Sequence, residues 1–578
     1  MKITEALRIV QATVADAPPF KVTVACGFTP LHLRTFLNAH LQLALPHRNV
    51  TVTEGLYGDL CGTLERALDG DALAVVIEWP DLDARLDFRN AGKWDRETSS
   101  GVVEHANLVL SRIRTALVRM PQERPIALSL PSLPLPPIFP TPGWQWSDTE
   151  LLLKGTLLHF AAELARDGSV RVISVERLAQ DSPWDTRFDL KSDLKAGLPY
   201  TVKHAERVAA LLAKALVPPA PKKGVISDLD DTLWKGIAGE IGPENVQWDL
   251  AGDAQLHGLY QKVLGSLSEH GTLVAVASKN DPAVVAKAFE RPDIILRPEQ
   301  VFPIEAGWNA KSGSVKRILE TWNIAADSVI FVDDSPMELA EVAAQHPGIE
   351  CLLFPKDDPV AALELLKLLR DQCGKDRVSS DDTLRLASIR QGAAFRQQID
   401  DGSAPENFLM QAEAAITFDF GAAAEPRVLE LVNKTNQFNL NGRRFTPADW
   451  HKESSSDNAL VGAVLYEDKF GPLGTIAVVK AHFKAERLLV DTWVMSCRAF
   501  SRRIEHQTLR TLFETAGVDE IEFAFEPTAK NGPLQEFFST FLSETPRAAF
   551  RLTRPQFEEH CPSLYHETRE MKKAEAHG

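Results

Sequence analysis

The sequence predicts a multidomain α/β protein. Its 578 residues suffice for three or four domains of ordinary size. From the N-terminus onward, short apolar runs alternate with segments of helical spacing, which is the pattern of parallel sheets covered by helices. Nearer the C-terminus, apolar runs are joined by short turns, so we expect a mixed sheet there. We predict domains at residues 1–218, 219–372 and 413–578, with a charged helical connector at 373–412.

The first domain is predicted to contain a parallel sheet. Its clearest strand signals read FKVTVAC and ALAVVIEW, and a segment of helical spacing follows the first of them. A proline-rich stretch that begins at Pro131 is predicted to be a loop or an extended segment, because proline interrupts regular elements. The predicted strands cover residues 20–26, 49–53, 72–79 and 170–175, and the predicted helix covers 31–45.

Three carboxylates crowd the end of a buried strand in the second domain. Residues 225–227 complete an apolar run, and Asp228, Asp230, Asp231 and Thr232 follow it. Carboxylates this close repel one another unless a cation compensates them, and open α/β sheets bind ligands at the carboxyl ends of their strands. The stretch therefore predicts a site for a divalent cation with oxygen ligands, suited to Mg²⁺. The alternative is an acidic cluster that caps the following helix.

Asp228 and Asp230 can act on one ligand in different ways. An aspartate nucleophile can attack a phosphoryl group and form an aspartyl-phosphate. The second carboxylate can protonate the leaving oxygen and later activate water. The short intervals to the next strands leave no room for a large cap domain, so we expect an open site from which another domain or a partner excludes water. Trp234 either lines this pocket or packs in the core.

Four strand-end motifs, in this order, resemble those of the haloacid dehalogenase (HAD) superfamily. They read DLDDT, ASKND, GWNAKSGS and VDDSP. The resemblance implies a nucleophile and an acid/base in the first motif, a phosphate clamp in the second and third, and metal-binding carboxylates in the fourth. The implied site residues are Asp228 and Asp230 for catalysis, Thr232, Ser278 and Lys311 for phosphate binding, and Asp228, Asp230, Asp333 and Asp334 for Mg²⁺.

The same motifs, with the WNAKS run, resemble the FkbH-like branch of that superfamily. Characterised members of this branch take a phosphorylated three-carbon acyl donor, 1,3-bisphosphoglycerate. They deliver the dephosphorylated glyceryl unit to the phosphopantetheine thiol of an acyl carrier protein. The resemblance implies the same activity here, in polyketide-type or related natural-product biosynthesis, with Mg²⁺ as cofactor and a carrier protein as partner.

The third domain is predicted to perform the acyl transfer. Its strand signals cover residues 416–420, 459–468, 473–483 and 487–495, and a hairpin turn is predicted at Gly471-Pro472. The runs TNQFNLNGRRF, DKFGPLG, SCR and PTAKNGPLQEFF resemble the GNAT-type acyltransferase half of FkbH-like proteins. The resemblance implies a groove for acyl-pantetheine donors beside a central strand.

Cys497 matches the SCR cysteine, which the resemblance identifies as the carrier of the acyl group in a thioester. A thiolate attacks an acyl phosphate readily, and Arg498 beside it would lower the pKa of the thiol. The alternative is a buried cysteine that packs as a small apolar residue. Asn436, Gln437 and Asn439 form an amide-rich stretch that suits either a polar turn or, with Arg498, a pocket for the acyl-pantetheine group.

The first domain resembles the SGNH-hydrolase-like domain that FkbH-like proteins of this length commonly have. Its turn after the first strand reads Gly27-Phe28-Thr29, where the hydrolases have GDS, and His204 lies where a catalytic histidine would. Threonine is an inferior nucleophile here because its methyl group crowds the attack. We therefore expect a scaffold or binding module without hydrolase activity, in which His204 is structural.

Charge limits the partners of the protein. A formal net charge of −16 without a long basic run argues against nucleic acid as the main partner. Carrier proteins are usually acidic, so binding one would require a local basic patch. The candidates for such a patch are Arg443, Arg444, Arg498, Arg502 and Arg503.

The six cysteines lack CxxC pairs, which suits a reducing compartment. No apolar run has the length of a signal peptide core or a membrane span, so we expect a cytoplasmic protein that does not bind membranes.

Two other functions stay open at this point. One is a stand-alone Mg²⁺-dependent phosphatase of a small phosphometabolite, and the other is a non-catalytic scaffold that binds carrier proteins.

Overall fold

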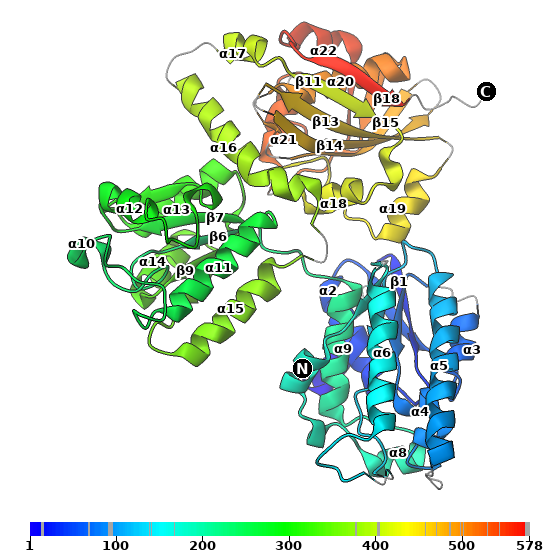
Figure 1. Cartoon of the computed structure of the whole chain (residues 1–578). Coiled ribbons are helices and arrows are strands. Elements are labelled where there is room, and N and C mark those ends of the chain that lie inside the picture. The colour runs from blue at the N-terminus through cyan, green and yellow to red at the C-terminus, as the bar shows by residue number, and fades with distance from the viewer. Residues whose placement is uncertain are drawn as a thin grey trace. The chain divides into compact units, whose positions relative to one another are not determined.

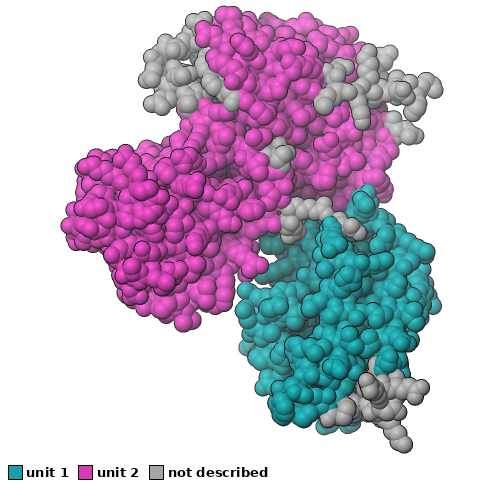
Figure 2. All heavy atoms as spheres, viewed as in Figure 1, with its two compact units in different colours: residues 1–219 teal, residues 220–578 magenta. Residues whose placement is uncertain are grey.

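The chain folds into two compact units, Met1–Pro219 and Ala220–Gly578, which Figure 2 colours separately. The computed structural model describes residues 1–12, 17–66, 70–90, 96–137, 139, 141–166, 168–375, 378–400, 405–456, 458–469, 471–484, 487–496, 499–500, 502–528, 530–542 and 544–572. These residues form two parallel sheets and one mixed sheet, so the predicted α/β class is confirmed.

Unit 1 is a five-stranded parallel sheet with helices on both faces (Figure 1). Its strands are β1 (Pro19–Ala25), β2 (Asn49–Glu54), β3 (Ala72–Val76), β4 (Ile126–Ser129) and β5 (Val170–Val172), in the order β2-β1-β3-β4-β5. Its helices are α1 (Ile3–Gln11), α2 (Leu31–Ala44), α3 (Leu60–Glu65), α4 (Trp79–Leu82), α5 (Arg96–Val118), α6 (Asp148–Arg166), α7 (Val175–Asp181), α8 (Leu190–Ala196) and α9 (Val202–Leu216). Apolar residues of α1, α2 and α9 pack on one face, and those of α3, α5 and α6 on the other.

Two predicted strands of unit 1 are shorter than expected. Both apolar runs continue directly into a helix, because Trp79 begins α4 and Val175 begins α7. All five residues of β3 are buried, as expected for a parallel strand that is covered on both faces. The described residues of the proline-rich stretch form neither helix nor strand before α6.

The first sheet of unit 2 is also parallel, with the order β10-β9-β6-β7-β8. Its strands are β6 (Gly224–Ser227), β7 (Leu273–Ser278), β8 (Ile304–Ala306), β9 (Val329–Asp333) and β10 (Glu350–Leu353). Its helices are α10 (Ala238–Ile241), α11 (Gln255–Glu269), α12 (Pro282–Phe289), α13 (Lys311–Trp322), α14 (Pro336–Gln345) and α15 (Pro359–Cys373). Helices α11, α12 and α15 pack on one face, and α13 and α14 on the other. After β6 the chain reaches α11 through turns and the four-residue α10, which leaves the carboxyl edge of the sheet without a large cap.

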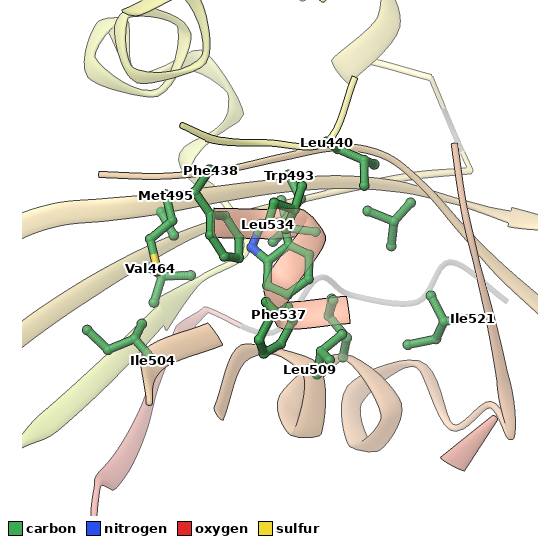
Figure 3. Packing of buried hydrophobic residues seen from close by; sticks show 14 of the residues in the cluster. Phe438, Leu440, Val464, Trp493, Met495, Ile504, Leu509, Ile521, Leu534 and Phe537 are labelled. Carbon is green, nitrogen blue, oxygen red and sulfur yellow. The ribbon is translucent and has the colours of Figure 1, made fainter. Parts of the chain in front are cut away.

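The second sheet of unit 2 is mixed, with the order β17-β16-β15-β14-β13-β11-β18 and β12 paired to β15. Its strands are β11 (Ala415–Asp419), β12 (Phe438–Asn439), β13 (Ala459–Asp468), β14 (Gly471–Lys484), β15 (Arg487–Met495), β16 (Glu520–Phe523), β17 (Phe550–Thr553) and β18 (Glu567–Lys572). Its helices are α18 (Pro426–Lys434), α19 (Pro447–Ser454), α20 (Ile504–Ala516), α21 (Gly532–Ser539) and α22 (Arg554–His560). Figure 3 shows Trp493 of β15 at the centre of its core, where the indole packs edge-on against Phe438 and Phe537.

The connector contains α16 (Ser380–Asp400) and α17 (Pro405–Gln411), and α16 packs against both α13 and β14. The hairpin between β13 and β14 differs from the prediction. Asp468 pairs with Gly471, so Gly471-Pro472 begins β14 and does not form the turn. None of the described helices is both long and apolar enough to cross a lipid bilayer.

Candidate active site

The tips of three neighbouring strands form the candidate site in unit 2. Strand β6 lies between β7 and β9, and its last residue, Ser227, pairs with Val332 of β9. The next residue on each strand, Asp228 and Asp333, therefore reaches the same edge of the sheet, and the backbone N–H of Asp228 donates to the carbonyl of Val332 at 2.9 Å. The fold thus brings the first and fourth motifs together, as predicted.

Lys311 joins these two carboxylates. It is the first residue of α13, and its Nζ lies 2.9 Å from Asp228 Oδ1 and 2.6 Å from Asp333 Oδ2. The three side chains are nearly buried, with exposed fractions of 6 % for Lys311, 6 % for Asp228 and 0 % for Asp333. In such surroundings an ammonium group between two carboxylates interacts far more strongly than it would in water.

Burial and mutual repulsion perturb the titration of this group of charges. Burial raises the pKa of Asp228 to about 7; Lys311 opposes this shift, and the charge of Asp333 adds to it. Burial also raises the pKa of Asp333. The pKa of Lys311 is raised, because the charges of Asp228 and Asp333 outweigh the effect of its burial. Perturbed charges at one sheet edge are typical of functional sites.

Asp230 is held by three hydrogen bonds beside this group. Its Oδ1 accepts from the indole N–H of Trp234 at 2.8 Å and from the backbone N–H of Ala238 at 3.1 Å, and its Oδ2 accepts from Asn280 Nδ2 at 2.9 Å. Burial raises the pKa of Asp230 above its ordinary value. The indole of Trp234 is fully buried, so of the two predicted positions the core is the one observed, and the residue orients Asp230 from there.

Three of the four predicted metal ligands come together. One oxygen each from Asp228, Asp333 and Asp334 lies within 4.8 Å of the other two, which makes this group able to hold a cation. The Asp230 carboxylate is not in this group; its oxygens accept the hydrogen bonds just described, and its predicted role in metal binding stays a prediction. Carboxylate oxygens are the ligands that Mg²⁺ prefers, and about 3–4 Å separates neighbouring ligand oxygens of one such ion, so the group is of the size that this cation requires.

The buried hydroxyl oxygen Thr232 Oγ1 lacks a hydrogen-bond partner among the described residues. Asp228 Oδ1, in contrast, contacts the Lys311 ammonium at 2.9 Å. Buried polar atoms are normally paired, so the unpaired hydroxyl points to an absent ligand. Ser278, the last residue of β7, is also buried at the same edge. The donor set therefore fits both a hard cation and a phosphoryl group.

Lys356 was missed by the sequence analysis. Its Nζ lies 2.8 Å from Asp231 Oδ2 and 2.8 Å from Asp334 Oδ2, and these hydrogen bonds raise its pKa. It lies shortly after β10, so a search of the tips of every strand in this sheet would have found it. Asp231 itself has a left-handed backbone (φ 53°), a conformation that non-glycine residues adopt mainly where function or tight packing requires it.

This fold has a solved counterpart. The chain is similar to the N-terminal part of the protein BF1531 from Bacteroides fragilis, which contains a phosphatase domain and was crystallised in complex with Mg. The TM-score is 0.51 at 18 % identity, over 64 % of this chain and 98 % of that one, and a likeness at this identity establishes a shared fold. A region of a fungal β-N-acetylglucosaminidase described as a GCN5-related glucosamine N-acetyltransferase aligns with a TM-score of 0.15 at 11 % identity, over 93 % of this chain and 66 % of that one, and supports no argument. No protein family and no curated protein matches the sequence.

In the mixed sheet, the predicted acyl carrier Cys497 and its neighbour Arg498 lie outside the described residues. Ser496, directly before them, follows the end of β15 and lines a cavity of about 100 Å³ together with Asn436 and Gln437. Two of the predicted acyl-pantetheine ligands thus share a cavity.

Asn439 does not take the predicted role. Its buried amide donates to the carbonyl of Thr435 at 3.0 Å, and its Oδ1 accepts from the N–H groups of Asn441 and Gly442. Asn441 in turn donates to the carbonyls of Asp491 and Ala524, on β15 and just after β16. These amides fix the loop, and the short β12 within it pairs with β15 at Val494 and Met495.

The predicted basic patch is not an array of free charges. Arg443 pairs with Glu453 at 2.9 Å, and Arg444 donates to the carbonyls of Val432 and Thr435. Arg502 is buried and pairs with Asp468 at 3.7 Å, and Arg503 donates to the carbonyl of Ser563. Each of these four cations therefore has partners within the chain.

In unit 1, the side chains of Thr29 and His204 have different hydrogen-bond partners. His204 is fully buried, and its ring nitrogens contact the hydroxyls of Ser132 at 2.9 Å and Ser182 at 3.0 Å. The Thr29 hydroxyl instead donates to the carbonyl of Ala196. Burial lowers the pKa of His204 to about 3, so this histidine is neutral.

Proposed function

We propose that the chain is a Mg²⁺-dependent FkbH-type enzyme. Its parallel sheet in unit 2 removes the phosphate of a phosphoglyceryl-type acyl group, and its mixed sheet loads the acyl group as a thioester on an acyl carrier protein. The observation that supports the phosphatase step is the contact of Lys311 with both Asp228 and Asp333 at the carboxyl edge, beside Asp334. This arrangement combines a nucleophile, a countercharge and a cation site within a few ångström.

Phosphoryl transfer follows from the positions of two aspartates. Asp228 attacks the phosphorus, so that a bond forms to its carboxylate oxygen while the bond to the ester oxygen breaks. Asp230, whose pKa is raised by burial, gives its proton to the leaving oxygen. In the second step Asp230 takes a proton from water, which attacks the aspartyl-phosphate and releases inorganic phosphate.

The surrounding residues orient the reactants. Lys311 offsets the negative charge of the phosphoryl group and of Asp228, and Ser278 and Thr232 can donate hydroxyl hydrogen bonds to phosphoryl oxygens. Asp228, Asp333 and Asp334 would hold Mg²⁺, which when bound neutralises charge on the phosphoryl oxygens. Trp234 and Asn280 keep Asp230 in a fixed orientation.

The phosphatase step is tested by steady-state release of phosphate from 3-phosphoglycerate and related monoesters, with Mg²⁺ and with EDTA. We expect turnover that requires the metal and is lost in Asp228→Asn, a substitution that keeps the shape of the side chain. A matched control is Asp253→Asn, which alters an exposed aspartate of the loop before α11 and leaves turnover unchanged. Equal turnover by wild type and Asp228→Asn would refute the proposal.

The acyl half rests on the SCR and TNQFNLNGRRF motifs and on the cavity next to Ser496. Attack of the Cys497 thiolate on the carbonyl carbon of 1,3-bisphosphoglycerate would form a carbon–sulfur bond, break the bond from that carbon to the 1-phosphate oxygen and release inorganic phosphate. Exchange with the pantetheine thiol would then replace one thioester by another. Intact-mass analysis of wild type and Cys497→Ala with 1,3-bisphosphoglycerate, Mg²⁺ and phosphopantetheinylated carrier protein tests this step. We expect a glyceryl or phosphoglyceryl adduct that depends on the thiol.

The same experiments separate the two other functions. Phosphatase turnover that is intact in Cys497→Ala, without any adduct on wild type, identifies a stand-alone phosphatase. Binding of a carrier protein without turnover by wild type identifies a scaffold.

A further inference from the structure

A basic cavity lies at the amino edge of the parallel sheet in unit 2. Its volume is about 420 Å³; Lys222 and Lys223 line it from just before β6, and Asp327 from just before β9. Asp228 and Asp333 lie at the opposite ends of the same strands, roughly 16 Å away at about 3.3 Å per strand residue. The basic cavity is therefore separate from the candidate active site.

The lining of the basic cavity has an excess of positive charge. Salt bridges to Glu350, Asp382 and Glu430, which lie outside the lining, neutralise part of it. Together with Asp327, these three residues give four carboxylates against six cations around the cavity. The chain as a whole has the opposite balance, with a formal net charge of −16. The six cationic lining residues are Lys222, Lys223, Lys375, Arg385, Lys434 and Arg444.

The cations around Lys375 are close enough to disturb one another. The pKa of Lys375 is lowered to about 8 by burial and by the charges of Arg385 and Lys434, although Asp382 opposes the shift. Lys375 Nζ lies 2.8 Å from Asp382 Oδ1, which also receives a hydrogen bond from Arg385 at 3.2 Å. One carboxylate thus serves two cations, and a further anion in the cavity would relieve their repulsion.

Helix ends account for part of this charge. Helices α15 and α18 both end at the basic cavity, and cations stabilise the negative ends of helices. Asn433 and Asn436 line the cavity as well, and each amide carries two N–H donors, of which one of Asn433 already donates to the carbonyl of Phe445. The hydroxyl of Ser328, also in the lining, donates to Asp327. Cations combined with neutral hydrogen-bond donors are the chemistry that binds phosphate.

A smaller cavity adjoins the basic one. The two share Lys223, Ser328, Arg385, Lys434 and Asn436. The smaller cavity, of about 100 Å³, continues along apolar side chains of both parts of unit 2 to Gln437, Met495 and Ser496. A ligand with its phosphate among the cations would extend the rest of its chain in this direction.

We infer that the basic cavity binds the phosphate of a small phosphate ester whose uncharged chain enters the adjoining cavity. A phosphopantetheine arm and a free phosphometabolite both offer this chemistry. The preference for phosphopantetheine over a free metabolite rests on the proposed acyl transfer. The existence of a phosphate site does not depend on that proposal.

The test is isothermal titration calorimetry of the full chain with inorganic phosphate, 3-phosphoglycerate and 4′-phosphopantetheine, at low ionic strength and with EDTA. Lys434→Gln and Lys222→Gln each remove one cation from the lining, and we expect each to weaken phosphate-ester binding about tenfold. Lys367→Gln is the matched control: Lys367 is paired with Glu364 one helical turn away, as Lys434 is with Glu430, and lies outside the lining. It should bind as wild type does.

A second pair of variants separates this site from the phosphatase site. Binding at the basic cavity persists in Lys311→Gln and in Asp228→Asn, and the latter loses phosphatase turnover if the proposed function is right. The Lys311→Gln titration is run at pH 5, where a proton neutralises one of the two carboxylates and the loss of stability is small. Loss of all binding there overturns the inference, because the only anion site is then the active site. Equal affinities of Lys434→Gln and Lys367→Gln overturn it too, since the cations then serve the helix ends alone.

The three probes distinguish the source of the phosphate. Tighter binding of 4′-phosphopantetheine than of inorganic phosphate, a preference that Gln437→Ala removes, supports a pantetheine arm in the adjoining cavity. Tightest binding of 3-phosphoglycerate supports a free metabolite. Equal affinity for all three overturns the assignment of the adjoining cavity to the ligand's chain.

Discussion

Replacement of Lys311 by methionine should destabilise the parallel sheet of unit 2, and by an amount that depends on pH. Methionine keeps most of the volume of the side chain but removes the ammonium that lies 2.9 Å from Asp228 and 2.6 Å from Asp333. Removing one partner of a buried ion pair leaves an uncompensated charge and costs about 3–5 kcal/mol. We expect a loss of this size at pH 8 with EDTA present, so that no metal replaces the ammonium.

The loss should be much smaller at pH 5. Burial already raises the pKa of Asp228 to about 7, above its ordinary value near 4. A carboxyl group whose pKa is raised on folding destabilises the folded state as the pH rises. This destabilisation grows between the ordinary pKa of the group and its pKa in the folded state. Without Lys311 the pKa of Asp228 or Asp333 rises further, so at pH 5 a proton neutralises one of them.

Hydrogen exchange read by mass spectrometry suits this measurement, because the chain has several domains and global unfolding is not two-state. Peptides that cover β6 and β9 should exchange more than a hundredfold faster in the variant at pH 8, after correction for intrinsic rates, since 1.36 kcal/mol corresponds to tenfold. Lys316→Met on the same helix alters an exposed lysine, 3.9 Å from Glu320, and should change the free energy by less than about 0.5 kcal/mol. Equal losses for Lys311→Met at both pH values would refute the reasoning.

Three further predictions follow from single contacts. Trp234→Phe keeps a buried ring but removes the N–H that donates to Asp230, so the phosphatase kcat should fall about tenfold. Asp230→Asn should reduce kcat far more. Equal kcat for Trp234→Phe and wild type would contradict the role of Trp234 in orienting Asp230. Lys480→Met removes the fully buried ammonium that pairs with Glu453 and Asp491. The free energy of opening of β14, measured by hydrogen exchange, should fall by about 3–5 kcal/mol. Lys484→Met, which alters an exposed lysine of the same strand, should leave this free energy unchanged. Thr29→Ala should leave the hydrolysis of generic esters by the full chain at the background rate, as in wild type; ester hydrolysis that depends on Thr29 would show a catalytic unit 1.

Much of the fold could be predicted from local patterns. Strands β6, β7 and β9 are continuous apolar runs, as parallel strands covered on both faces must be, and each ends where polar residues begin. The predicted strand at 459–468 coincides with β13 and the one at 487–495 with β15. Predictions failed where an apolar run continued into a helix, as at Trp79, because periodicity cannot separate the end of a buried strand from the start of a buried helix.

The candidate site divides in the same way. Asp228 and Asp333 could be predicted to meet because the carboxyl ends of neighbouring parallel strands lie at one edge of a sheet, whereas Lys311 was placed with them by the resemblance to the HAD motifs. The turn of the Asp230 carboxylate toward Trp234 and Asn280 could not, since it depends on side-chain rotation after the backbone is placed. Asn439 was misjudged for a related reason: an amide serves a ligand or its own loop equally well until its partners are known.

The sequence by itself determined which strands end in carboxylates and in what order they follow one another. Only the tertiary structure decided that Lys356 bridges Asp231 and Asp334, and that Lys222, Lys375 and Lys434 line one cavity. Residues this far apart in the chain meet through the packing of strands and helices on one another. Burial then sets the energy of their charges, and neither effect can be read from local sequence.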